Sequence, residues 1–71
     1  MSTYRINADG SVTLPGPPDV GDWTVHEMDD GLWTADNPVQ GFLRSRFNAD
    51  FRATFRTRDE ALAAFGVEVP A

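Results

Sequence analysis

The segment 51–65 constrains the fold most, because its hydrophobic period changes from two to about 3.6 within a few residues. Up to Arg56, apolar and polar residues alternate, which is typical of a half-buried strand. Thr57 then stands three residues before Glu60, the spacing of a capping box. In that motif the threonine oxygen accepts from the glutamate amide, and the carboxylate reaches back to the threonine amide. The sequence therefore predicts a strand that leads directly into a helix over 58–65.

The strand and the helix each carry one apolar face. Phe51, Ala53 and Phe55 share one side of the strand, and Ala61 begins an apolar stripe on the helix. Gly66 can take the left-handed conformation that ends many helices. We expect the core nucleus to consist of six large side chains: Trp23, Trp33, Phe51, Phe55, Leu62 and Phe65.

Residues 4–14 have the pattern of a β-hairpin, in which two alternating runs flank an Ala-Asp-Gly turn. A three-residue loop at that turn pairs Ile6 with Val12. It also pairs Tyr4 with Leu14, so the apolar side chains of both strands gather on one face.

A second hairpin is predicted around Asp29-Asp30-Gly31, and the length of its loop decides which side chains share a face. A two-residue loop brings Met28 and Trp33 together but places Trp23 among charged residues. A three-residue loop that ends in a left-handed glycine gathers four apolar side chains on one face: Trp23, Val25, Trp33 and Ala35. It leaves four polar ones on the other: Thr24, His26, Thr34 and Asp36. The second register separates polarity better and is the one we expect.

The fold class that follows is α+β: an antiparallel sheet of hairpins with one C-terminal helix packed on one face. Residues 42–47 are expected to add a strand with Leu43 and Phe47 inward, which makes 42–56 a third hairpin. The predicted organisation is one small domain over 1–71 with five parts: a hairpin at 4–14, a Pro/Gly connection at 15–22, antiparallel strands over 23–56, the helix, and a tail at 66–71.

Size and composition limit the classes of protein that this chain can belong to. A chain of 71 residues buries only about 60% of its unfolded surface, and without cysteine it has no disulfide or thiolate metal site to add stability. Self-association is one way to compensate. No run is long enough for a signal-peptide core or a membrane span, so we expect a cytoplasmic protein with no membrane partner.

The residues do not form a recognisable catalytic set. His26 is the one histidine, and its neighbour Glu27 points to the opposite face of a strand, so a general base or metal site needs Asp36 or Asp50 as partner. With no lysine and no cysteine, most covalent mechanisms lack their nucleophile. The two Asp-Gly turns are explained by hairpin chemistry without a calcium ion. We expect no enzyme activity, no cofactor and no metal.

Positive charge is concentrated in one part of an acidic chain. The net charge is −5, yet five of the six arginines fall within residues 44–58. The polar face of the predicted strand and its surroundings gives six candidate partner-binding residues: Arg44, Arg46, Arg52, Thr54, Arg56 and Arg58. Such a face binds phosphates or carboxylates, or it pairs with aspartates of neighbouring strands and keeps the sheet soluble.

A hairpin with tryptophans, a further strand and the motif Phe55-x-Thr57-x-x-Glu60-Ala61 at the start of a helix together resemble a known domain. It is the small three-stranded sheet-plus-helix domain at the N-terminus of tyrosine recombinases, the phage integrases, and the resemblance covers about residues 23–66. In that family the uncovered face of the sheet lies in the DNA major groove. The resemblance would therefore assign DNA contacts to Arg52, Thr54 and Arg56.

Two functions remain as hypotheses. The first is a small non-catalytic regulatory protein of bacterial or phage type that recognises a protein partner through an open sheet face or an edge strand. The alternative is nucleic-acid binding through the arginine-bearing sheet face. We favour the protein partner because an open sheet face, free edge strands and the lack of a catalytic set suit a small protein-binding domain. The net negative charge repels anionic partners at long range, but a local arginine patch can still bind them at short range.

Overall fold

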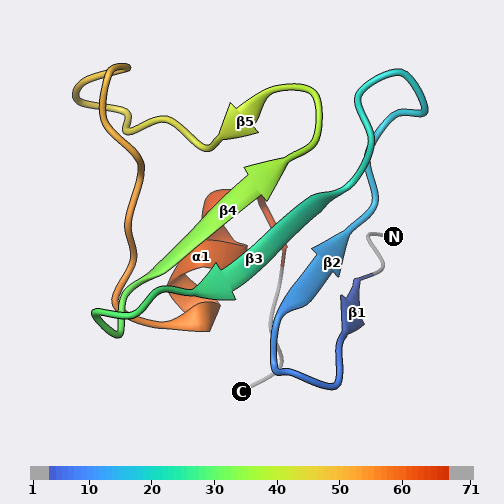
Figure 1. The fold of residues 1–71 in the computed structure, drawn as a ribbon, viewed down its shortest axis with the longest axis horizontal. Helices are drawn as coiled ribbons and strands as arrows, with labels where there is room; N and C mark the ends of the chain where they lie inside the picture. The colour runs from blue at the N-terminus through green and yellow to red at the C-terminus, as the bar shows by residue number, and fades with distance from the viewer. Residues whose placement is uncertain (1–3, 68–71) are drawn as a thin grey trace.

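A computed structural model describes residues 4–67 and shows a five-stranded antiparallel sheet with one short helix, an α+β arrangement (Figure 1). The strand order follows the chain, β1-β2-β3-β4-β5, and each strand pairs with the next. The elements are β1 (Arg5–Ile6), β2 (Val12–Leu14), β3 (Trp23–Glu27), β4 (Trp33–Asn37), β5 (Gly41–Phe42) and α1 (Arg58–Ala64).

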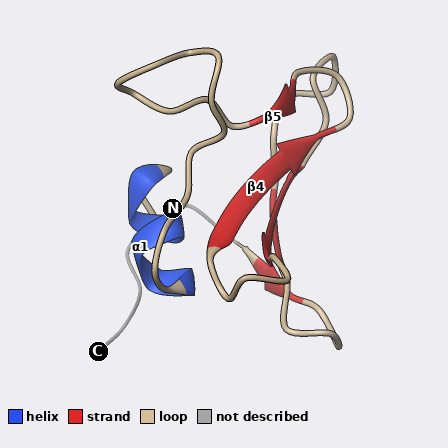
Figure 2. Ribbon diagram, turned by 60° about the vertical axis from the view of Figure 1, so that its left-hand side comes forward, coloured by secondary structure: helices blue, strands red, loops and turns tan. Residues whose placement is uncertain are grey.

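The helix lies against one face of the sheet, where it contacts β3 and β4 (Figure 2). The core between these two layers consists of Val12, Leu14, Val25, Ala35, Ala61, Leu62 and Val67. Six larger side chains pack around it and stay partly exposed: Tyr4, Trp23, Trp33, Leu43, Phe55 and Phe65. The tryptophans therefore lie at the rim of the core, where the Trp23 and Phe65 ring centroids are 5.5 Å apart.

The first two predicted hairpins and their registers are confirmed. Ile6 lies opposite Val12 in the first hairpin. In the second, Val25 lies opposite Ala35, and the loop ends at Gly31 with a φ of 85°. Glycine adopts that left-handed conformation without steric cost, so Gly31 permits the three-residue loop. The loop fixes the register, and the register decides which side chains share a face.

The helix begins and ends nearly where the sequence predicts. Thr57 is its N-cap and accepts a 3.1 Å hydrogen bond from the Glu60 amide. The Glu60 carboxylate accepts a 3.1 Å hydrogen bond from the Arg56 amide rather than from the Thr57 amide, so the reciprocal half of the capping box is shifted by one residue. At the C-terminus, the amides of Gly66 and Val67 donate to carbonyls of the last turn, which is a Schellman motif.

The predicted regular strand over 51–56 is wrong. This segment forms isolated bridges only, Phe55 with Trp33 and Arg52 with Arg44. The reason is that two segments pair with the outer edge of β4. β5 pairs with the C-terminal end of β4, and only the first residue of β4, Trp33, remains to pair with Phe55. The strand predicted over 42–47 is reduced in the same way to the two residues of β5 and the bridge at Arg44.

Three side chains lie elsewhere than the alternation predicts. The alternation predicts Thr34 outside, but it is fully buried, and its hydroxyl is satisfied by donating a 2.9 Å hydrogen bond to the Ala53 carbonyl. Phe47 and Phe51 were expected inside, but both are exposed. Of the predicted tail, residues 68–71 lie outside the described part of the chain. Within residues 4–67, α1 is too short to cross a membrane.

Candidate partner-binding surface

The segment between β5 and the bridge to β4 forms a hairpin that projects from the sheet. We call residues 43–53 the arginine hairpin. Its base is held by a 2.8 Å hydrogen bond from the Ala53 amide to the Leu43 carbonyl, followed by one from Ser45 to Phe51. The Asn48 side chain accepts from the Asp50 amide and closes the tip. Figure 2 shows that it leaves the sheet on the side where α1 lies.

Two phenylalanines on this hairpin are exposed. The side chain of Phe47 is 93% exposed and that of Phe51 is 64% exposed, although the alternation predicts both on the apolar side. The physical reason is the length of α1. Seven residues at about 1.5 Å each give a helix of roughly 10 Å, and this short helix packs on β3 and β4.

A groove of about 730 Å³ lies between the arginine hairpin and the end of α1. Its apolar lining comes from the arginine hairpin, from α1 and from Phe55 between them: Leu43, Phe47, Ala53, Phe55, Ala63 and Ala64. The two alanines are exposed on α1, and their methyl groups leave the helix surface flat. The groove therefore presents apolar surface that no described residue covers.

The arginines of the hairpin are partly ordered by an aromatic ring. The guanidinium carbons of Arg44 and Arg52 lie 5.6 and 5.2 Å from the Phe42 ring centroid, within cation–π range. Arg52 also forms a 2.9 Å ion pair with Asp36. The two side chains are 37% and 40% exposed, so solvent screens the pair and its main effect is to fix where Arg52 lies.

The Asp36 carboxylate interacts both with the arginine hairpin and with the open face of the sheet. Its second carboxylate oxygen contacts the ring nitrogen Nε2 of His26, which lies diagonally across the β3–β4 pair. Asp36 is thus one of the two residues, Asp36 and Asp50, that the sequence predicts as candidate partners of His26. Within residues 4–67, no group of three His, Cys, Asp or Glu side chains could hold a metal ion.

The six candidate residues do not form one patch. Arg44, Arg46, Arg52 and Thr54 line the groove. Arg56 and Arg58 do not, because both lie next to the start of α1. The Arg58 guanidinium lies 3.8 Å from the Asp59 carboxylate on its own helix. The candidate surface is therefore the groove, which includes four of the six candidate residues.

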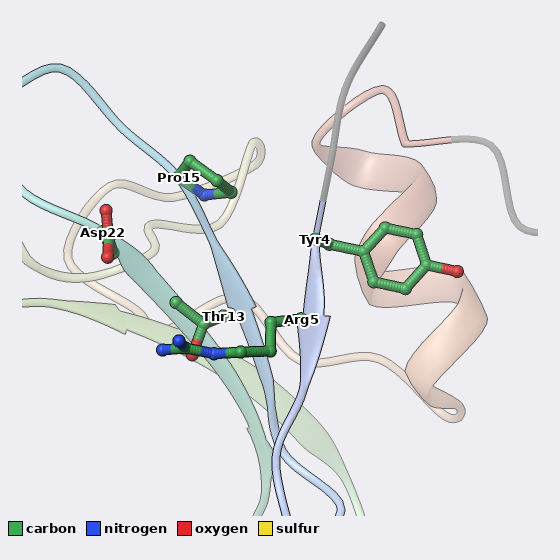
Figure 3. A pocket seen from close by; sticks show the side chains of 5 residues that line it. All are labelled: Tyr4, Arg5, Thr13, Pro15 and Asp22. Carbon is green, nitrogen blue, oxygen red and sulfur yellow. The ribbon is translucent and has the colours of Figure 1, made fainter.

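A second and smaller hollow lies beside β1 and β2 (Figure 3). It has a volume of about 250 Å³ and is lined by Tyr4, Arg5, Thr13, Pro15 and Asp22. Figure 3 shows the Arg5 side chain extending across Thr13, whereas the Tyr4 ring points the other way, toward α1. These side chains do not converge on a common point, and we assign no function to this hollow.

Sequence reasoning missed the aromatic and alanine parts of the surface. The alternation places Phe42, Phe47 and Phe51 in strands, and the sequence pattern gives Ala63 and Ala64 no part in binding. A signal was present in the sequence: the apolar alternation runs over both arms of the hairpin, while the capped helix is too short to cover them. Comparisons with protein-family models, with curated proteins and with solved structures find no match to this chain.

Proposed function

We propose that this chain is a small non-catalytic binding protein that recognises a protein partner through the groove and the arginine hairpin. The observation that carries the proposal is Phe47, a large apolar side chain that is 93% exposed beside three arginines. Arginine and aromatic residues are enriched at the centres of protein interfaces. This surface replaces the open sheet face and the edge strand as the best-supported recognition surface.

The location of the proposed contact has a physical basis. Residues that pack in the core are needed for folding, whereas Phe47 and Phe51 contribute little burial within the described chain. An exposed apolar pair is unfavourable in water unless a partner covers it. The tip also has few backbone hydrogen bonds to the sheet, so it can adjust to a partner without disturbing the fold.

Nucleic-acid binding is the second candidate, and the exposed rings favour it specifically. Bases stack on aromatic side chains, and arginines contact phosphates. The recombinase resemblance would add DNA contacts by Arg52, Thr54 and Arg56. Arg52 is already paired with Asp36, so we expect few phosphate contacts and a log–log salt dependence with a slope of only about −2.

The cellular setting belongs to the same proposal. A small acidic binding protein of this kind suits a cytoplasmic accessory or regulatory role in a bacterium or a phage. Its small core also suits a protein that gains stability when it binds its partner.

The experiment is a comparative affinity capture from host lysate with three forms of the full chain. These are the wild type, a Phe47→Ser/Phe51→Ser double variant and an Ile6→Ser control, which replaces an exposed apolar residue far from the groove. We expect a protein that is retained by the wild type and the control and lost by the double variant. Equal recovery by all three forms would refute the proposed surface. Loss of nucleic acid rather than protein would favour the second candidate.

A further inference from the structure

We infer that the groove binds a short acidic segment of a partner protein, which places large apolar side chains between the arginine hairpin and α1 and carboxylates on Arg44 and Arg46. This inference rests on the proposed function and specifies the chemistry of the partner. It is carried by the lining of the groove, by the distribution of charge around it and by the geometry of the hairpin.

The apolar part of the groove fits side chains rather than a flat surface. Its volume of about 730 Å³ lies in the range of roughly 300–1,000 Å³ that accommodates compact ligand groups. Ala63 and Ala64 form one wall without projecting into it, and Phe47 and Phe55 supply aromatic surface on the other side. A leucine or an aromatic side chain of a partner would pack against these apolar lining residues.

The charge around the groove selects the sign of the partner. Three arginines line it, and no aspartate or glutamate is among its lining residues. Arg52 is held by Asp36, whereas Arg44 and Arg46 have no carboxylate within ion-pair distance in the described part of the chain. Guanidinium groups bind carboxylates through paired hydrogen bonds. The guanidinium groups of Arg44 and Arg46 can therefore bind carboxylates of a partner.

The same charges argue against a second copy as the occupant. In a two-fold symmetric contact, each residue near the axis meets its own equivalent. A dimer formed through this groove would bring the arginines of one copy next to those of the other. That repulsion disfavours the contact, so the partner is a different chain with the opposite charge.

The first experiment selects ligands from a displayed library of random peptides of about twelve residues, with the full chain as bait. We expect the enriched peptides to combine aspartate or glutamate with leucine or aromatic residues and to carry a net negative charge. Enrichment of basic or purely polar peptides, or no enrichment above background, would overturn the inference.

The second experiment measures the affinity of the most enriched peptide, synthesised alone, for four forms of the chain. We expect Arg46→Glu to weaken binding at least tenfold by reversing a groove charge. Ala64→Phe should do the same by filling the groove, and it keeps a side chain that a helix tolerates. Arg5→Glu is the matched control, an arginine outside the groove, and its affinity should stay within twofold of wild type. Equal weakening by Arg5→Glu would show general charge attraction and overturn the inference.

Amide chemical shifts of the labelled chain give the location and separate this inference from the proposed function. We expect the largest changes at Phe47, Ala63 and Ala64, and no displacement of the peptide by an oligothymidylate. Shifts confined to β1 and β2, or displacement by the oligonucleotide, would overturn it. If the library fails while lysate capture still depends on Phe47 and Phe51, the proposed function stands and the acidic segment is wrong. If both fail, both are wrong.

Discussion

Replacing Leu62 with alanine tests the arrangement of the core most directly. Leu62 lies on α1, is only 1% exposed and packs among the buried residues of the sheet. The change removes three carbon atoms, which at about 0.8 kcal/mol each gives roughly 2.4 kcal/mol before the cavity is counted. Buried leucine-to-alanine changes cost about 2–5 kcal/mol in total. A protein of this size has roughly 4–11 kcal/mol of stability, so Leu62→Ala should leave it marginally folded.

Phe51→Ala is the matched comparison because the sequence places Phe51 in the same core and the structure does not. Its side chain is 64% exposed, so we expect a cost below about 1 kcal/mol despite the larger side chain. Urea unfolding followed by tryptophan fluorescence measures both free energies of unfolding, with Trp23 and Trp33 as probes at the rim of the core. The m-value should be the same in both variants if each remains two-state.

The expected order of the two costs is what can refute the reasoning. If Phe51→Ala destabilised the protein more than Leu62→Ala, the arginine hairpin would pack on the core and the groove would not exist as described. A cost below about 1 kcal/mol for Leu62→Ala would show that α1 contributes little to stability.

Two further predictions concern the N-cap of α1 and the turn between β1 and β2. Thr57→Ala should lower the free energy of unfolding by about 1 kcal/mol, because the Glu60 amide loses its acceptor; Thr57→Ser should restore most of it, and an unchanged urea midpoint would contradict the cap. The Ser11 hydroxyl and amide both donate to the Asp9 carboxylate and lower its pKa below the ordinary 3.8. The resulting stabilisation is present above pH 3.8 and is lost as the pH falls through the lowered pKa. A carboxyl-carbon NMR titration should show this pKa rising toward 3.8 in Ser11→Ala, and no rise would contradict the assignment.

Local sequence signals predicted the hairpins and the helix well because each depends on residues close in the chain. Gly31 can take the left-handed conformation that the three-residue loop requires, and that loop fixes the register of β3 and β4. Thr57 and Gly66 mark the two ends of α1 in the same local way. In each case one turn or cap determines which side chains face the core.

The arginine hairpin was predicted less well because its conformation depends on distant parts of the chain. A strand over 51–56 needs a free edge, and whether β4 offers one depends on where β5 pairs. The exposure of Phe47 and Phe51 depends on how far α1 extends over the sheet. Alternation showed the side on which these residues lie, but not whether another element covers it.

The interaction of Arg52 with Asp36 could be predicted only in part. The register of the second hairpin places Asp36 and His26 on one face, so their contact follows from the turn. The approach of Arg52 to the same carboxylate follows only from the fold. For this reason the sequence identified the arginines as candidates but could not say which of them are free.

The shared outer edge of β4 has a consequence for how this fold can change. β5 and Phe55 fix the two ends of the intervening segment, so the chain re-enters the sheet at the same place whatever lies between them. Residues at the tip can then be lengthened, shortened or exchanged while the hydrogen bonds at the base persist. The sheet and α1 thus act as a frame for an interchangeable loop, and a new binding specificity can be grafted here without redesigning the core.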